Sequence, residues 1–224
     1  MNHEPKIRAV AFDFDGTLVD TFEHVIRAFE FVLPQYGITA TRDEIQAHMG
    51  LTLHECYEKL VSKEAAAPAK QKHHDAQQSE ELFGLITSFD AMHETLQQLK
   101  KRGVELTIIT NRTQPSLNSI LEHVGLQNQF AVVISPELVE RPKPYPDGSL
   151  AICQKLGILP RELLLVGDTG VDMQTAKGAC LRAAVGITHG FGSRQELEVA
   201  GADYIVDSLP ELIDVIERIE RGED

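Results

Sequence analysis

Short apolar runs, separated by longer amphipathic stretches, set the pattern of this chain. Apolar residues recur with helical spacing in residues 117–124 and 209–219, which predicts helices. The apolar runs predict strands, because they are short and rich in Val, Ile, Leu and Phe. These runs cover residues 7–12, 104–109, 130–134, 163–166 and 182–186, with a shorter run at 204–206. Alternating strands and helices predict an α/β fold with a doubly wound, mostly parallel sheet.

Residues 18–88 have a different pattern, because helical stripes occur there without a credible strand. Apolar stripes cover residues 22–33 and 53–61. In residues 41–44 and 52–55 a threonine precedes a glutamate by three positions, which is typical of a capping box at the start of a helix. An eight-stranded barrel is the lesser alternative, because this interval offers it no strand. The expected division is a sheet domain of residues 1–17 and 89–224 and an inserted helical domain of residues 18–88.

Composition narrows the class of protein. The chain has 224 residues, enough for one large domain and an insertion. Its formal net charge of −13 disfavours nucleic acid as a partner. Its three cysteines are widely spaced, which indicates neither a disulfide framework nor a zinc site. Residues 1–8 lack a signal-peptide core, and no apolar run approaches the ~20 residues that span a membrane, so we expect a cytoplasmic protein.

Two aspartates follow the first predicted strand. The strand would deliver Asp13 to the edge of the sheet, and a sharp turn at Gly16 would let Asp15 face the same site. One carboxylate can then attack a phosphate ester to form an aspartyl-phosphate, while the other transfers protons. A strand followed by an ordinary Asp-Gly turn is the alternative for this segment alone.

Three later segments carry complementary chemistry at or after the ends of predicted strands. Thr110 and Asn111 can hold phosphate oxygens without adding charge. Prolines on both sides of Lys143 restrict its backbone, so its ammonium can be held near a dianion. Asp168 and Asp172 would project from one side of a helix's first turn, and their oxygens suit Mg²⁺. Because ligands bind beyond the carboxyl ends of the strands in such sheets, we expect one shared site.

In this order, the motifs resemble those of the haloacid dehalogenase-like hydrolase superfamily. Residues 166–173 and 201–204 are most similar to its phosphoglycolate phosphatase-like branch. The resemblance implies a helical cap after the first motif and Mg²⁺ as cofactor. Asp172 would bind the metal directly, bind it through water, or orient Lys143. The implied roles are nucleophile and metal ligand for Asp13, general acid–base and backbone metal ligand for Asp15, phosphate binding for Thr110, Asn111 and the catalytic Lys143, and metal binding for Asp168 and Asp172.

The resemblance further implies hydrolysis of a small phosphorylated metabolite, with phosphoglycolate as the leading substrate. Inorganic pyrophosphate, a nucleoside monophosphate or a sugar phosphate could serve on the same scaffold, and a phosphomutase would share the same residues. A non-catalytic phosphate- or partner-binding protein is the alternative of another class. Asp15 argues against it, since such a protein has no use for an acid there, and also against the dehalogenase and phosphonatase branches.

Other polar residues are expected to have structural roles. His73 and His74 lie in a polar stretch and predict a solvated helix face, not a metal site. Residues 190–194 lack the full dinucleotide fingerprint and predict a loop. Thr52 precedes the second apolar stripe, and its favoured role is to cap that helix. His54 is then expected to be exposed in the first turn. The side chains that could still reach the site are Thr52, His54, Arg141 and Arg194.

Overall fold

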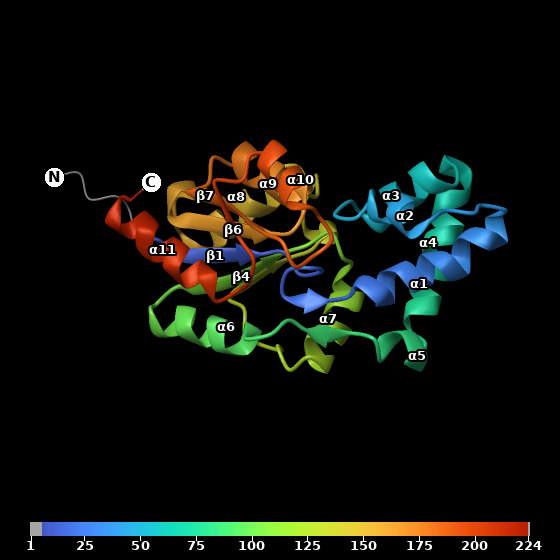
Figure 1. Cartoon of the computed structure of the whole chain (residues 1–224), viewed down its shortest axis with the longest axis horizontal. Helices are drawn as coiled ribbons and strands as arrows, with labels where there is room; N and C mark the ends of the chain where they lie inside the picture. Colours follow the sequence, from blue (N-terminus) through green and yellow to red (C-terminus); the bar gives the residue numbers. More distant parts are fainter. Residues whose placement is uncertain (1–5, 224) are drawn as a thin grey trace.

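A six-stranded parallel sheet with helices on both faces forms the larger part of the molecule (Figure 1). The computed structural model describes residues 6–223. The strand order is β5-β4-β1-β6-β7-β8, and every neighbouring pair is parallel. The predicted doubly wound α/β fold is therefore confirmed. The strands are β1 (Ala9–Phe12), β4 (Glu105–Ile109), β5 (Val132–Ile134), β6 (Leu163–Gly167), β7 (Ala183–Ile187) and β8 (Tyr204–Val206).

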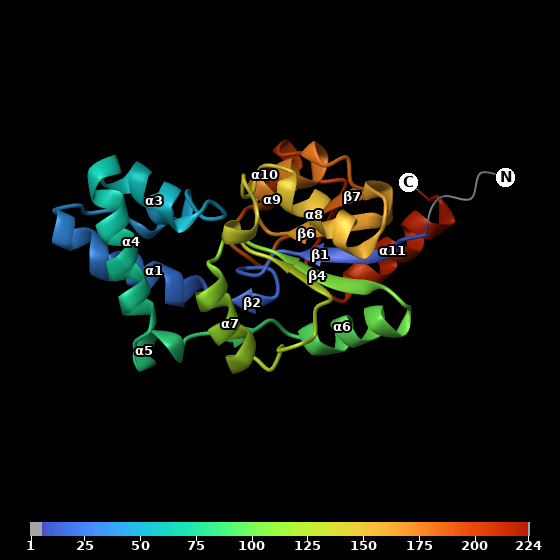
Figure 2. The same ribbon diagram turned by 180° about the vertical axis from the view of Figure 1, so that it is seen from behind.

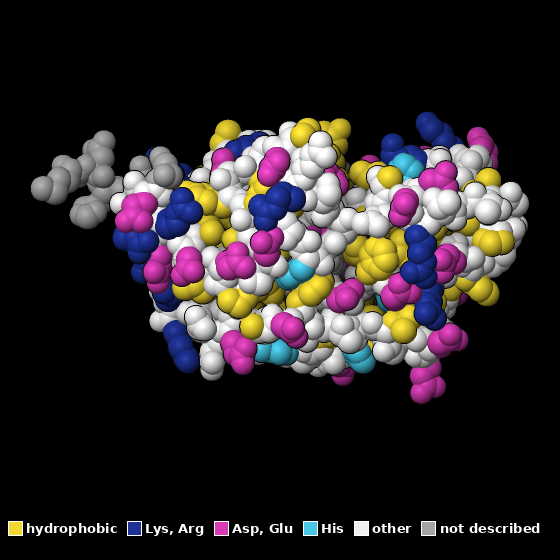
Figure 3. Space-filling view, viewed as in Figure 1, with side chains coloured by type: hydrophobic (Ala, Val, Ile, Leu, Met, Phe, Trp, Pro, Cys, Tyr) yellow, Lys and Arg dark blue, Asp and Glu magenta, His cyan; other side chains and the backbone are white. Residues whose placement is uncertain are grey.

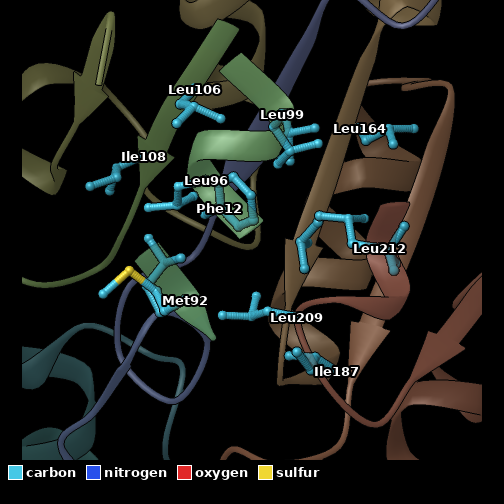
Figure 4. Close-up of a cluster of buried hydrophobic side chains, with 14 of the residues drawn as sticks. Phe12, Met92, Leu96, Leu99, Leu106, Ile108, Leu164, Ile187, Leu209 and Leu212 are labelled. Carbon is cyan, nitrogen blue, oxygen red and sulfur yellow. The ribbon is translucent and has the colours of Figure 1, made fainter. Parts of the chain in front are cut away.

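Two helical layers bury the sheet, and the alternation of side chains along β1 shows why it needs both. Val10 and Phe12 pack towards α6, α7 and α11, a cluster shown in Figure 4. Ala9 and Ala11 pack towards α8, α9 and α10 on the opposite face. A strand buried on both faces has a continuous apolar sequence, as β1 does. These helices are α6 (Met92–Lys101), α7 (Gln114–His123), α8 (Asp147–Leu156), α9 (Gly170–Gly178), α10 (Arg194–Val199) and α11 (Glu211–Arg221).

Five further helices form a separate layer beyond the carboxyl ends of the strands (Figures 1 and 2). The layer has its own apolar core, to which α1 contributes Ile26 and Phe29 and α3 contributes Tyr57. The predicted capping boxes are present at Thr41 and Thr52. The helices of this layer are α1 (Phe22–Val32), α2 (Arg42–Gln46), α3 (Leu53–Leu60), α4 (Lys63–Gln77) and α5 (Glu80–Phe83).

Short strands lie at both ends of this helical layer. β2 (Val19–Asp20) and β3 (Thr87–Ser88) pair in an antiparallel sheet where the chain enters and leaves the layer. The prediction that residues 18–88 contain no strand was therefore wrong, because strands of two residues are too short to produce an alternating apolar pattern. Short 3₁₀ helices complete the fold at Leu33–Tyr36, Pro136–Leu138 and Pro160–Glu162.

Surface charge, cysteines and helix hydropathy can be compared with the predictions from composition. Lys and Arg side chains are interspersed with Asp and Glu on the face drawn in Figure 3, without a continuous basic area. Cys56, Cys153 and Cys180 are free thiols. Within residues 6–223, no helix combines the length and apolar character that crossing a membrane requires.

Candidate active site

The carboxyl ends of three adjacent strands bring the predicted site residues together. β1 lies between β4 and β6 in the sheet. Asp13, Thr110 and Asp168 are the first residues after these strands, and all three are buried. Asp172 joins them from the first turn of α9. Ligand oxygens of Asp13, Asp168 and Asp172 lie within 4.8 Å of one another, so residues far apart in sequence form one carboxylate cluster.

Lys143 places a buried ammonium in the carboxylate cluster. Its Nζ lies 2.8 Å from Oδ1 of Asp13 and donates to Oδ1 of Asp172 over 2.6 Å. The Asn111 amide fixes the backbone of Lys143 by accepting from its N–H at 3.1 Å and donating to its carbonyl at 2.9 Å. The same amide group donates to the carbonyl of Gly50 in the helical layer. Asn111 therefore uses its polar atoms to position the lysine loop against both parts of the molecule.

Negative charge exceeds positive charge in this cluster. Burial raises the pKa of Asp13 to about 7, although the ammonium of Lys143 opposes the shift. Burial and the neighbouring carboxylates Asp13 and Asp172 also raise the pKa of Asp168 well above its usual value. Three buried carboxylates with one ammonium therefore fit an additional cation. Their hard oxygen atoms suit Mg²⁺ in particular.

A glycine-lined loop shapes the position of Asp168. A Cβ atom at Gly16 or at Gly190 would lie 2.2 Å from Oδ2 of Asp168, which leaves no room for a side chain at either position. The carboxylate accepts from the Phe191 N–H at 2.7 Å and from the Thr17 hydroxyl at 2.9 Å. Residues 190–192 form a loop, as predicted, but its contribution to the site was missed, because it depends on contacts across the sheet.

Arg112 is a site residue that the sequence analysis did not identify. Its Nε and NH2 groups donate to both oxygens of Asp15 at 2.7–3.0 Å, and its NH1 donates to Ser116. The Thr21 hydroxyl also donates to Asp15. Although burial acts in the opposite direction, Arg112 lowers the pKa of Asp15. Its position directly after Thr110 and Asn111 was the only signal in the sequence.

A cavity of about 90 Å³ lies between the strand ends and the helical layer. Its lining includes Asp13, Asp15, Thr110, Asn111 and Lys143 on the strand side. On the opposite side it is lined by α1, α3, α4 and the loop at residues 49–51. Within the described part of the chain, the predicted substrate-binding residues therefore line one shared cavity.

Two histidines of α4 also line this cavity. His73 is only 1% exposed, and His74 is half-buried, so the prediction of a solvated face was wrong. α4 is rich in Ala, Lys and Gln, which hides its buried face from an analysis of apolar spacing. Neither histidine belongs to a cluster of metal-ligating side chains within residues 6–223.

The other side chains considered from the sequence have structural roles. Thr52 caps α3, and His54 is exposed beside Glu58. Arg141 and Arg194 lie at the surface. Arg141 pairs with Asp147, and Arg194 pairs with Asp207. None of the four side chains lines the cavity of the described structure.

Known proteins with similar sequences and folds cover nearly the whole chain. Residues 10–185 match the family model of haloacid dehalogenase-like hydrolases. Pyrophosphatases PpaX from Bacillus mycoides and Bacillus cereus are 28% and 29% identical over 221 residues, covering 96% and 97% of this chain and 99% and 100% of theirs. A solved haloacid dehalogenase-like hydrolase from Bacteroides fragilis has a TM-score of 0.86 at 29% identity, covering 92% of this chain and 100% of that one. A protein described as a predicted phosphatase from Clostridium acetobutylicum has a TM-score of 0.84 at 27% identity, covering 96% and 100%.

Proposed function

Since this chain belongs to the haloacid dehalogenase-like hydrolase family and is a phosphatase, we propose that it hydrolyses a small phosphorylated metabolite through an aspartyl-phosphate, with Mg²⁺ as cofactor. The observation that carries this proposal is the position of the Asp13 carboxylate. It lines the cavity between the strand ends and the helical layer, and it lies 2.8 Å from the buried ammonium of Lys143. A cavity volume of about 90 Å³ favours a small phosphorylated metabolite over a phosphoprotein.

The first step would be attack by Asp13 on phosphorus. The backbone N–H of Phe14 donates to Oδ1 of Asp13 at 2.6 Å, and Lys143 contacts the same oxygen, so the carboxylate has a fixed orientation. The bond from phosphorus to the leaving oxygen breaks as the acyl-phosphate forms, and that oxygen takes a proton from Asp15. Lys143 would stabilise the negative charge of the phosphoryl group.

The second step would be attack by water on the acyl-phosphate. Asp15 would accept the proton of this water, which releases inorganic phosphate and restores Asp13. The lowered pKa of Asp15 beside Arg112 suits this step, because it keeps the carboxylate ionised. The first step requires the protonated form of Asp15, which Arg112 disfavours because it lowers the pKa.

Asp13, Asp168, Asp172 and the backbone carbonyl of Asp15 are the groups that would hold Mg²⁺. When bound, the cation supplies positive charge that offsets the carboxylates and the phosphate dianion. Asp172 also accepts from Lys143 and from the Thr169 hydroxyl, so it can orient the lysine as well. We further propose that the helical layer, residues 18–88, acts as a cap, and that the protein works in the cytoplasm.

The candidate substrates are small phosphate esters and one phosphoanhydride. Phosphoglycolate is the leading candidate from the motif resemblance, and the names of the Bacillus relatives favour inorganic pyrophosphate. A panel of phosphorylated metabolites, ranked by kcat/KM for phosphate release, distinguishes these candidates.

Metal dependence tests the proposed chemistry. Phosphate release should require Mg²⁺ and stop in excess EDTA, because without a cation the carboxylates repel one another and the substrate. Restoring Mg²⁺ after chelation should restore activity, which controls for irreversible unfolding. Full activity in excess EDTA would contradict the metal assignment. No release from any ester with Mg²⁺ present would favour a non-catalytic phosphate-binding protein.

A further inference from the structure

Arg112 is a buried cation beside the proposed general acid, and the protein uses only part of its hydrogen-bonding capacity. A guanidinium has five N–H bonds. Nε–H and one N–H of Nη2 donate to Asp15, and one N–H of Nη1 donates to Ser116. Within residues 6–223, the second N–H on each of Nη1 and Nη2 has no acceptor. The side chain is only 7% exposed, and donors in such a position are normally paired with a ligand or water.

The contacts of Arg112 place its guanidinium at the wall of the active-site cavity. Its two partners, Asp15 and Ser116, both line this cavity, and so does Arg112 itself. Thr113 also lines the cavity and directly precedes α7. The positive end of the helix dipole favours an anion there. This part of the wall therefore combines a cation, unused N–H donors and a helix start.

The hydrogen bonds of Asp15 indicate where the leaving group would lie. Its Oδ1 accepts from the Thr21 hydroxyl and from both Nε and Nη2 of Arg112. Its Oδ2 accepts only from Nε of Arg112, at 2.8 Å, and has room for the leaving oxygen. A hydrogen bond to Oδ2 spans about 2.7 Å, so the leaving oxygen would lie one contact away from the guanidinium. Atoms bonded directly beyond that oxygen could then reach Arg112.

The positive charges of the site would serve different ends of the substrate. Lys143 contacts Asp13 and Asp172, and the same two carboxylates belong to the proposed Mg²⁺ site. The ammonium and the metal would therefore serve the phosphoryl group that Asp13 attacks. Arg112 is the only other Lys or Arg that lines the cavity in the described part of the chain. In the first proposed step Asp15 is a neutral acid, so an anionic leaving group would supply the counter-charge that the buried guanidinium needs.

We propose that Arg112 binds an anionic leaving group, and that the substrate carries a carboxylate or a second phosphoryl group within two bonds of the leaving oxygen. This inference rests on the proposed phosphatase function. Phosphoglycolate and pyrophosphate meet the condition. Nucleoside monophosphates and sugar monophosphates do not, because their leaving groups are uncharged. Arg112 would thus select the charge of the leaving group, and the helical layer would select its size and shape.

A matched pair of esters measures the charge preference. Phosphoglycolate and its amide, 2-amino-2-oxoethyl phosphate, have the same shape, but only the acid has a charged leaving group. With saturating Mg²⁺, kcat/KM should be about 10- to 100-fold higher for the acid, the usual scale of a hydrogen bond to a charged group. Equal values, or a preference for the amide, would overturn the proposal and leave the phosphatase function intact. Phosphate release from no ester at all would instead overturn the proposed function, and this inference with it.

Substitutions distinguish a contact with the leaving group from support of Asp15 alone. Arg112→Met removes the charge and should lower the acid-to-amide ratio of kcat/KM to about 1 or below. Arg112→Lys keeps the charge and should retain part of the preference. Arg102→Met is the matched control, because Arg102 pairs with Glu217 outside the cavity, and it should leave the ratio unchanged. An equal loss for both esters in Arg112→Met, with an unchanged ratio, would show that Arg112 acts only through Asp15 and would refute the contact.

Binding to the wild-type protein covers the case in which Arg112→Met fails to fold. 3-Phosphonopropionate has a carbon atom in place of the leaving oxygen and therefore binds without turnover, and propylphosphonate lacks its carboxylate. With Mg²⁺ present, calorimetry should give a Kd at least about 10-fold lower for 3-phosphonopropionate. The guanidinium ¹⁵N resonances of Arg112 should shift with this ligand and change less with propylphosphonate. Equal Kd values, or Arg112 resonances that respond equally to both ligands, would refute the contact.

Discussion

At the scale of single residues, the two aspartates of the first motif divide the proposed chemistry between them. Asp13→Asn should abolish both turnover and covalent trapping of labelled phosphate, because an amide cannot form the acyl-phosphate. Asp15→Asn should retain the nucleophile and lower kcat by about 10² to 10⁴, the usual contribution of general acid–base catalysis. Asp207→Asn, at an exposed aspartate outside the cavity, is the control and should remain active. Labelled phosphate bound covalently to the Asp13→Asn protein would disprove the nucleophile assignment.

Arg112 forms a mostly buried ion pair with Asp15. Removing the arginine side chain would leave the Asp15 carboxylate unpaired and poorly solvated. The side chains of Arg112 and Asp15 are 7% and 18% exposed. Arg112→Ala should lower the free energy of unfolding by about 2 kcal/mol or more, since breaking a buried pair leaves one charge unpaired. The double variant Arg112→Ala, Asp15→Asn should lose less than the sum of the single losses. Urea unfolding of the four proteins measures the coupling, and strict additivity would show that the pair contributes no stability.

At the scale of elements, the loop between β7 and α10 positions Asp168, one of the proposed metal ligands. A Cβ at Gly190 would meet Asp168 Oδ2 at 2.2 Å and the Gly16 carbonyl at 2.3 Å. Gly190→Ala should therefore displace Asp168 and raise the Mg²⁺ concentration needed for half-maximal activity at least about 10-fold, as other perturbations around metal ligands do. The readout is a Mg²⁺ titration of phosphate release at constant ionic strength.

Gly178→Ala supplies the matched control for this loop. A Cβ at Gly178 would make only ordinary contacts with Pro146, the nearest at 3.6 Å. Because this glycine lies in a helix, Ala there should stabilise the protein slightly, by up to about 1 kcal/mol, and leave the Mg²⁺ titration unchanged. Equal effects of the two substitutions on the titration would show that the loop does not position Asp168.

At the scale of the whole molecule, we expect the sheet domain to carry the catalytic groups and the helical layer to set substrate specificity. Every charged residue that lines the cavity belongs to the segments outside α1–α5, and the helical layer contributes apolar and neutral side chains. Replacing residues 18–88 by the corresponding segment of a relative with a different substrate should therefore change the ranking of esters and preserve Mg²⁺ dependence. A folded, active chimera that keeps its original ranking would place specificity in the sheet domain. Phosphate release from the ester panel measures the ranking.

Local pattern in the sequence predicted the sheet, and it placed most residues of the candidate site at the ends of its strands. Strands buried on both faces require continuous apolar runs, and β1, β4 and β6 have them. In a parallel sheet the ends of such strands meet at one edge, so Asp13, Thr110 and Asp168 could be expected together before any contact was known. The strands β2 and β3 were missed, because two residues are too few to show the alternation of apolar and polar positions that indicates a strand.

By itself, then, the sequence determined the α/β alternation and the strand-end motifs, because each of these is encoded by neighbouring residues. Tertiary structure alone decided which side chains surround those motifs. Arg112 meets Asp15 across 97 positions, and the donor to Asp168 comes from a residue 23 positions later. The burial of His73 likewise depends on how α4 packs against α1 and α3. Such contacts bring together residues that are distant in the chain, and no local pattern of hydrophobic and polar positions encodes them.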